Sequence, residues 1–327
     1  MYRFGCARMI SAVAVLLLAP APALAQWLPD PFTNLKVLQK DISRQDLVAM
    51  MGGFTRALGV RCTHCHVGTE GEPLASYKFA ADDKPAKRKA RVMMELVRDI
   101  NAKYLAGLDT RIDPPVKVEC STCHRGVTEP RTLQDVLRRE YETGGLAALT
   151  AKYRDLRERY YGRSAYDFGE VPLADLAGEI WNAGKPDESV RLHALNVDMN
   201  PTSAFAKRQH ASLAITRSFR QEGIAPGTAR YRELKDLYGP GIFAEPLLDE
   251  VGSRLLNANQ IDPAIAVLRL NVEAFPTSSS THERLADGYV KASDTKQAIE
   301  SYERALAIDS KNSTAREKLD KLRAKSP

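Results

Sequence analysis

Residues 61–67 read RCTHCHV, and residues 119–126 read ECSTCHRG, so one chain carries the pattern Cys-x-x-Cys-His twice. The only other cysteine, Cys6, lies near the start of the chain. Two copies that use every later cysteine indicate that the same chemistry takes place at both positions. The residues of the two copies are Cys62, Cys65, His66, Cys120, Cys123 and His124.

Paired cysteines serve several chemistries, and the adjacent histidine separates them. Four cysteines could form a disulfide framework, but a chain of 327 residues that is 44% hydrophobic does not need one to build a core. A four-cysteine zinc ribbon also fits the Cys-x-x-Cys spacing. A thioredoxin-like redox site would use a single pair within a strand and helix pattern that this sequence does not show. Cys-x-x-Cys-His is instead the attachment sequence of a c-type haem.

Haem attachment explains each position of the pattern. The two thiols add to the vinyl groups of the porphyrin, and the histidine binds the iron from one side. Two residues between the sulfur atoms let one helical turn span the edge of the ring. We therefore expect two covalently attached haem c groups. The first would be held by Cys62, Cys65 and His66, and the second by Cys120, Cys123 and His124.

A helix with two adjacent methionines precedes each motif, and these helices are the expected source of the second axial ligands. The first helix should begin after Ser43, with Asp46 at its third position, and should end at Gly59. Its apolar positions advance in steps of three and four and include Met51. Met50 lies about 100° around the helix.

The second helix follows Pro85, and its apolar stripe predicts that Met93 faces inward and that Met94 turns aside. Methionine is more often a core residue than a ligand. Two irons that each need a distal ligand reverse this preference, because His64 is confined within its own motif and the other histidines lie far along the chain. We expect Met51 and Met93 to be the ligands. Such His/Met coordination closes both irons to substrate and raises the reduction potential relative to His/His coordination.

Three stretches, in this order, carry a resemblance to a known family: residues 47–66 (LVAMMGGFTRALGVRCTHCH), 82–101 (DDKPAKRKARVMMELVRDIN) and 120–130 (CSTCHRGVTEP). They resemble the cytochrome c subunit of bacterial photosynthetic reaction centres, over about residues 32–133. The resemblance implies a repeated unit in which a helix supplies the axial methionine, and by position it also places the ligands at Met51 and Met93. Reaction-centre members of the family carry four haems and a membrane anchor, whereas two haems and no lipid anchor are expected here.

The start of the chain is typical of an export signal. Two arginines precede a short apolar run at residues 9–18, and small residues up to Ala25 supply a cleavage site. A retained membrane helix would need about 20 apolar residues, and this run is broken at Pro20. We expect a signal peptide at residues 1–25, cleaved after Ala25, and a periplasmic mature protein.

The second half of the chain is predicted to be helical and internally duplicated. LNVD at residues 195–198 returns as LNVE at residues 270–273, an offset of 75 residues. Within the second copy, large and small residues recur with the 34-residue period of tetratricopeptide repeats. The positions concerned are Gly252, Leu255, Ala264, Leu268, Pro276, Leu285, Ala286, Tyr289, Ala298, Tyr302 and Ala305.

These features predict an all-α chain with a small cytochrome domain of short helices and loops and a helical-repeat solenoid. After the signal peptide, we expect a dihaem cytochrome c domain at residues 26–135, a helical linker at residues 136–169 and a tetratricopeptide-like domain at residues 170–327. Such solenoids usually bind a peptide or protein on their concave face. The alternative is a passive cap that shields the haem domain or mediates self-association.

Charge gives a weaker indication of partners. The formal net charge of +6 falls to about +4 without the two signal arginines, and four haem propionates would bring the protein close to neutrality. The basic run PAKRKAR at residues 85–91 is expected on the outward side of the second helix. It would either steer an acidic redox partner or pair with propionates.

Two main functions fit this organisation. The first is a periplasmic electron-transfer protein, not an enzyme, whose repeats dock a redox partner protein that is soluble or membrane-bound. The second is a haem enzyme such as a peroxidase, which needs an acid–base group over an open iron, and the sequence places none there. Structural haems beside functional repeats are a third alternative. Neither nucleic acid nor a small-molecule substrate is expected.

Overall fold

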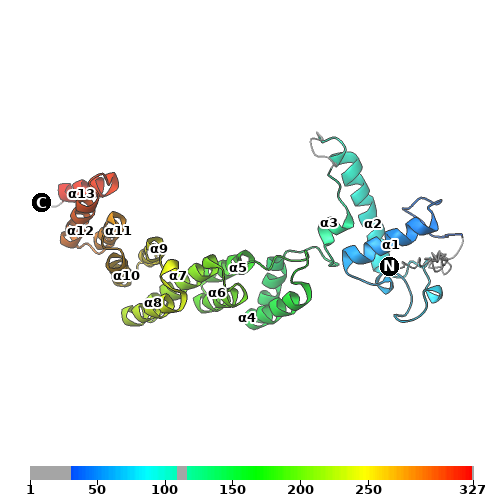
Figure 1. Ribbon diagram of the computed structural model, residues 1–327, viewed down its shortest axis with the longest axis horizontal. Helices are drawn as coiled ribbons and strands as arrows, with labels where there is room; N and C mark the ends of the chain where they lie inside the picture. Colours follow the sequence, from blue (N-terminus) through cyan, green and yellow to red (C-terminus); the bar gives the residue numbers. More distant parts are fainter. Residues whose placement is uncertain (1–30, 109–115, 326–327) are drawn as a thin grey trace, which may run out of the picture. The chain divides into compact units, whose positions relative to one another are not determined.

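The computed structural model describes residues 31–108 and 116–325. These segments contain helices and one isolated β-bridge, between Val67 and Lys78, so the expected all-α fold is confirmed (Figure 1). Contacts divide the chain into two units, residues 1–130 (unit 1) and residues 131–327 (unit 2). The predicted signal peptide, with cleavage after Ala25, lies outside the described residues.

Unit 1 is built from two longer helices and several short turns. The longer helices are α1 (Arg44–Leu58) and α2 (Pro85–Asp99), and α3 (Cys120–His124) is a short third helix. The turns are η1 (Cys62–His64), η2 (Leu74–Ser76) and the π-helical η3 (Ile100–Leu105), which continues α2.

The ends of α1 follow the predicted capping. Ser43 Oγ accepts a hydrogen bond from the Asp46 backbone N–H at 3.1 Å, and Gly59 ends the helix in the left-handed conformation with φ 64°. Gly59 also lies directly against Gly126, because a Cβ at Gly59 would overlap the Gly126 carbonyl oxygen. The Gly126 N–H donates to the Ala57 carbonyl at 2.8 Å. These contacts bring the end of α1 next to the second haem motif.

The chain that leads into the second motif is fastened to the end of α2. The Asn101 side-chain amide donates to the Val118 carbonyl at 2.7 Å, and the Val118 N–H donates back to Asn101 Oδ1 at 2.9 Å. The Asn101 side chain thus satisfies both the N–H and the carbonyl of the Val118 backbone. This pair of bonds fixes the position of Val118 relative to Asn101. The second motif is therefore tied to both α1 and α2.

Unit 2 begins with α4 (Leu133–Tyr160), a pair of helices joined at Gly145, where φ is 67° and ψ is −165°. Residues 136–169 were predicted to be a linker, but their apolar side chains form a core with α5 (Glu170–Asn182). Leu137, Leu149 and Tyr153 are completely buried there. This segment therefore belongs to the repeat unit, because its apolar face packs against the first repeat helix.

Eight further helices follow α5, and their spacing defines the repeats (Figure 1). The starts of α9, α11 and α13 are separated by 34 residues, as are those of α10 and α12, which is the tetratricopeptide period. The helices are α6 (Pro186–Met199), α7 (Ala204–Gln221), α8 (Ile224–Tyr238), α9 (Glu245–Asn257), α10 (Ile261–Ala274), α11 (Ser279–Lys291), α12 (Thr295–Ile308) and α13 (Ser313–Lys325), with the turn η4 (Pro240–Ile242) before α9.

The internal duplication is visible in the hydrogen bonds. Asn196 Nδ2 donates to the Glu170 carbonyl at 2.8 Å, and Asn271 Nδ2 donates to the Glu245 carbonyl at 3.0 Å. The two bonds are offset by 75 residues and join the same two positions of each helix pair. The helices α5 and α6 have the same lengths as α9 and α10.

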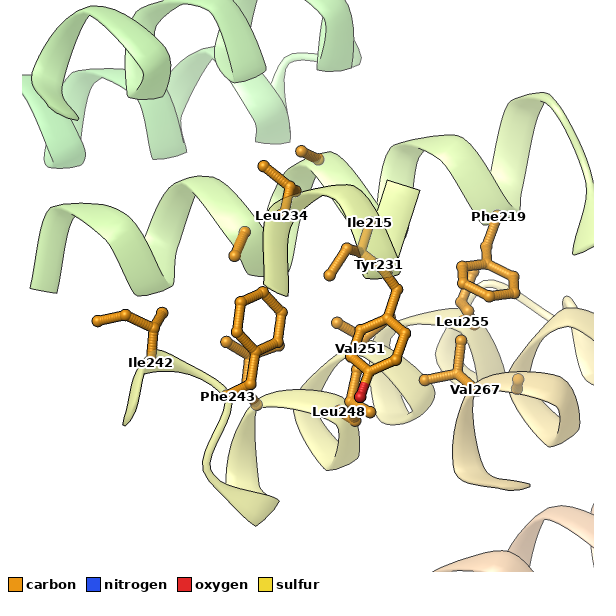
Figure 2. Packing of buried hydrophobic residues seen from close by; sticks show 14 residues of the cluster. Ile215, Phe219, Tyr231, Leu234, Ile242, Phe243, Leu248, Val251, Leu255 and Val267 are labelled. Atoms are coloured by element: carbon orange, nitrogen blue, oxygen red, sulfur yellow. The ribbon is translucent and has the colours of Figure 1, made fainter. Parts of the chain in front are cut away.

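The core of unit 2 is continuous where α7, α8, α9 and α10 meet, as Figure 2 shows. The rings of Tyr231 and Phe243 pack edge to face there, with centroids 5.6 Å apart. The small residue predicted at Gly252 is needed, because a Cβ there would lie 2.8 Å from Leu268 Cδ2. Other predicted repeat positions are buried too: Leu255, Ala264, Leu268, Leu285, Ala286, Tyr289, Ala298, Tyr302 and Ala305.

Within the described part of the chain, no helix has both the length and the apolar character that a membrane crossing requires.

Candidate haem sites

The first motif occupies a tight turn directly after α1. The His66 N–H donates to the Cys62 carbonyl at 2.9 Å, which keeps the two thiols and the imidazole on one turn. Cys62, Cys65 and His66 all line a cavity of about 350 Å³. Met51 of α1 lines the same cavity. The structure therefore brings together the four residues that the sequence assigns to the first haem.

The rest of this cavity is mainly apolar. The segment before α1 contributes residues 32–38, α1 contributes one face, and α2 contributes Ala90 and Met94. The chain between the first motif and α2 adds Leu74, Phe79 and Ala80. An apolar cleft with a few fixed polar groups is the usual form of a cofactor site. Two thiols and an imidazole beside a thioether fit the donor set of a c-type haem.

The charged side chains among the residues that line this cavity are all basic. Lys87 and Arg91 are nearly buried, with 12% and 15% of their side chains exposed. Both bind Asp82 Oδ1, at 3.1 Å and 2.8 Å, and Lys36 binds Asp82 Oδ2 at 2.7 Å. Hydrogen bonds from Arg91 and Lys36 hold the pKa of the Asp82 carboxyl well below its usual range. One carboxylate therefore faces three cations, and the cavity keeps a positive character.

This arrangement corrects the prediction for the basic run at residues 85–91. Lys87 and Arg91 turn toward the cavity, whereas Arg88 and Lys89 are exposed. Lys87 and Arg91 share a face of α2 because they are four positions apart. Asp82 lies before the helix and binds both side chains, so the face of α2 that carries Lys87 and Arg91 is held toward the cavity.

The electrostatic surroundings of His66 favour its neutral form. Burial lowers the pKa of His66, and the charge on Lys87 lowers it further. The Phe79 backbone acts in the opposite direction and raises the pKa of His66. Neutral imidazole is the form that binds iron. The first motif therefore presents its histidine in the required state.

Cys62, Cys65, Cys120 and Cys123 are free thiols in the structure. Among the described residues, no three His, Cys, Asp or Glu side chains gather as a metal site. Burial raises the pKa of Cys65 and of Cys120, which keeps these thiols protonated near neutral pH.

The second motif forms the short helix α3. Thr122 Oγ1 accepts a hydrogen bond from the Glu119 N–H at 3.0 Å, which caps its start, and Arg125 ends it with φ 50°. His124 Nδ1 lies 3.0 Å from the Val127 carbonyl. A hydrogen bond from Nδ1 leaves Nε2 as the atom that can bind iron, as is usual for metal-binding histidines. Cys123 is exposed and Cys120 is partly buried.

The structure reverses the predicted orientation of the methionines in α2. Met94 lines the first cavity, whereas 39% of Met93 is exposed. The prediction that Met93 faces inward is therefore wrong. The Met93 face is nevertheless apolar, because Val92, Leu96 and Tyr104 are exposed along the same stretch.

Comparison with known proteins agrees with the haem motifs. Residues 28–142 match the family model described as the photosynthetic reaction centre cytochrome C subunit. The chain is 36% identical over 91 residues to cytochrome c-554 of Chloroflexus aurantiacus. The matched segment covers 28% of this chain and 20% of that protein. The chain is also 36% identical over 89 residues to the photosynthetic reaction center cytochrome c subunit of Rubrivivax gelatinosus, covering 25% and 23% of the two chains.

The resemblance to this family of c-type cytochromes is therefore confirmed for the haem-motif part of the chain. The matched segment spans about a fifth to a quarter of the length of these two relatives. The family implies covalently bound c-type haem at the Cys-x-x-Cys-His motifs.

Solved structures similar to the chain include helical-repeat proteins. MamA of Desulfovibrio magneticus RS-1 is 13% identical and covers 59% of this chain and 82% of that one, with a TM-score of 0.25. The thermophilic TPR protein TTC0263 of Thermus thermophilus is 16% identical and covers 59% and 97%, with a TM-score of 0.29. The repeat assignment itself depends on the 34-residue helix spacing of this chain.

Proposed function

We propose that this protein transfers electrons through two covalently attached haem c groups, each with His/Met axial ligation. The observation that carries the proposal is the first cavity, where Cys62, Cys65, His66 and Met51 converge. When bound, a haem supplies one-electron redox chemistry. The chain contributes thiols for attachment and ligands from α1 and from the motif turn. Ligands on both sides of the iron exclude substrate from it.

The second haem would be held by Cys120, Cys123 and His124, with Met93 as its distal ligand. The exposed apolar face of α2 supports this proposal, because it offers Met93 with apolar neighbours on the side away from the first cavity. The Asn101 bonds to Val118 tie the lead-in of the second motif to the end of α2. In this arrangement Met94 would face the first haem, and Met93, about 100° around α2, would face the second.

The charged groups at the first cavity favour electron transfer over peroxidase chemistry. A peroxidase needs a group near the iron that accepts and returns a proton. The charged side chains that line the cavity are lysine and arginine, and arginine in particular stays protonated in proteins. Such residues favour the less positive, ferrous state of the iron, because cations repel the added positive charge of ferric iron.

We further propose export to the periplasm through a signal peptide at residues 1–25, and docking of a redox partner protein on the repeats. The repeat unit supports this role because its helices bury apolar clusters of their own and stack in pairs, in the manner of binding solenoids. The partner would be a soluble or membrane-bound redox protein, not a nucleic acid or a small-molecule substrate.

Three methionine variants test the ligand assignment. In the oxidised holoprotein, Met51→Ala should remove one haem's share of the thioether-to-iron charge-transfer band, and Met93→Ala should remove the other. After reduction, each variant should bind carbon monoxide at one iron. Met94→Ala is the matched control and should keep both shares of the band. Unchanged spectra in Met51→Ala and Met93→Ala would refute the assignment. Because Met94 lines the first cavity, loss in Met94→Ala but not in Met51→Ala would move the first ligand to Met94.

A further inference from the structure

The two haem-motif histidines are held in different ways. His124 bonds to the Val127 carbonyl within its own turn. His66 is held by Phe79, a residue from a separate part of the chain. The edge of one ring meets the face of the other, with centroids 4.9 Å apart and an interplanar angle of 67°.

Phe79 is presented to His66 by a hairpin-like loop, residues 67–81. The Lys78 N–H donates to the Val67 carbonyl at 2.9 Å, which closes the loop immediately after the motif. The Tyr77 ring stacks on Phe79 at 5.6 Å, and its hydroxyl donates to the Thr69 carbonyl at 2.8 Å. Tyr77 therefore supports the Phe79 ring, which in turn contacts His66.

Gly68 makes this stacking possible. A Cβ at Gly68 would lie 2.5 Å from Tyr77 Cγ, a distance at which the ring would have to move. Only a residue without a side chain lets the backbone approach the Tyr77 ring so closely. The loop is therefore packed from Gly68 through Tyr77 and Phe79 to His66.

The far side of the loop is anchored to α2 and to the segment before α1. Lys87 Nζ donates to the Phe79 carbonyl at 2.8 Å and to the Ala81 carbonyl at 2.7 Å. Asn34 Nδ2 donates to the Ala80 carbonyl. Lys87 is nearly buried, so these bonds are shielded from water. Phe79 is consequently held through its ring by Tyr77 and through its backbone by Lys87.

We propose that Phe79 is a positioning residue that sets the rotation of the His66 ring about its bond to the first iron, and that loop 67–81 is the clamp that holds Phe79. The inference rests on the proposed haem function. The plane of an axial imidazole determines which iron d orbital it overlaps, so its rotation sets the spin distribution over the porphyrin. Groups behind a ligating histidine fix its orientation in this way.

The test is proton NMR and EPR of the oxidised full-length holoprotein carrying Phe79→Leu. The paramagnetically shifted methyl signals of the first haem, identified as those that change in Met51→Ala, should shift in Phe79→Leu. The reduction potential of that haem should shift too. The signals of the second haem should stay in place, because His124 is held within its own turn. Phe79→Tyr keeps the ring and should restore the wild-type pattern.

A second variant covers the case in which Phe79→Leu does not accumulate. Gly68→Ala should displace Tyr77 and move the same set of methyl signals, whereas Gly107→Ala, outside the loop and with no neighbour within 4 Å, should not. Unchanged first-haem signals in Phe79→Leu, or equal shifts at both haems, would overturn the clamp. If mass spectrometry of the unsubstituted protein showed no haem on the first motif, the proposed function would be overturned, and the clamp with it.

Discussion

The two units of this chain bury apolar residues in opposite ways. In unit 2, side chains such as Leu137, Leu255 and Ala298 are completely buried, each in a different hydrophobic cluster. Among the described residues of unit 1, the buried hydrophobic side chains are Leu47, Ala57 and Val127. Many other apolar residues of unit 1 line a cavity, and Val92, Met93 and Leu96 are exposed on α2.

This difference indicates two sources of stability. Unit 2 is stabilised by helix-on-helix packing along the repeat, where each pair buries the face of its neighbour. In the proposed holoprotein, unit 1 would form walls around a haem, and its apolar side chains would complete their packing against that group. A ligand that binds only the folded state stabilises that state, and a covalent one does so at every concentration.

Removal of the haem attachments should have the largest effect, and it should be confined to unit 1. Replacing Cys62, Cys65, Cys120 and Cys123 with Ser should abolish slow amide hydrogen exchange in α1 and α2 while α9 and α10 stay protected. Hydrogen exchange with peptide-level mass spectrometry measures both regions at once. His64→Ser, an exposed change inside the first motif, is the control and should keep α1 protected. Slow exchange in unit 1 of the four-cysteine variant would contradict the comparison.

Gly59→Ala tests the contact that joins the end of α1 to the second motif. Its left-handed conformation alone should cost about 1–3 kcal/mol for alanine, and overlap with the Gly126 carbonyl should add to this cost. The matched control is Gly53→Ala, inside α1 with no neighbour within 4 Å, which should stabilise the helix by about 0.5–1 kcal/mol. Thermal unfolding followed at the haem absorbance should separate the two variants in opposite directions. Equal melting temperatures would show that the Gly59 contact contributes nothing.

Buried histidine makes the stability of unit 2 depend on pH. His193 is 1% exposed, neither ring nitrogen has a hydrogen-bond partner, and burial lowers its pKa from 6.5 to about 4. The unfolded chain therefore binds a proton more readily, so stability is complete above about pH 6.5 and is lost as pH falls toward 4. The loss from this residue is at most about 3 kcal/mol. His210, whose pKa is also lowered to about 4 by burial, should contribute in the same direction.

His193→Leu should reduce this loss, because the equivalent position of the second copy is already Leu268, a buried core residue. Urea unfolding of the full chain at pH 7 and pH 4.5, followed by far-ultraviolet circular dichroism, measures the difference. His282→Leu, at a position outside the core, should leave the pH dependence as it is. The same loss of stability in His193→Leu and in the unchanged protein would remove His193 as its cause.

Much of this structure could be predicted because the relevant signals are local. Ser43 and Gly59 mark the ends of α1 by capping chemistry, and the 34-residue period identifies buried positions such as Ala286 and Tyr302. The four residues assigned to the first haem line one cavity, because a helix and a short turn bring Met51 to the same cavity as the motif. Local rules suffice where the partners lie within a few helical turns of each other.

The errors arise where a distant residue decides the outcome. Met93 lies on an apolar stripe, but the inward face of α2 is selected by the bonds of Lys87 and Arg91 to Asp82, which lies outside that helix. The spacing of Lys87 and Arg91 was visible in the sequence, yet basic residues are normally assigned to the surface. The Phe79 contact with His66 depends on the closure of loop 67–81. No periodic pattern in the sequence predicts this closure. The packing of residues 136–169 also depends on a distant part of the chain, because their apolar side chains contact α5.

The central claim is that each of the two Cys-x-x-Cys-His motifs carries a covalently attached haem. The most direct measurement is the intact mass of the purified protein after expression with haem-attachment machinery, followed by peptide mapping of the motifs. The account predicts the mass of the mature polypeptide plus two haem groups, one on the peptide with Cys62 and Cys65 and one on the peptide with Cys120 and Cys123. A mass equal to that of the polypeptide alone, or with haem on one peptide only, would contradict it.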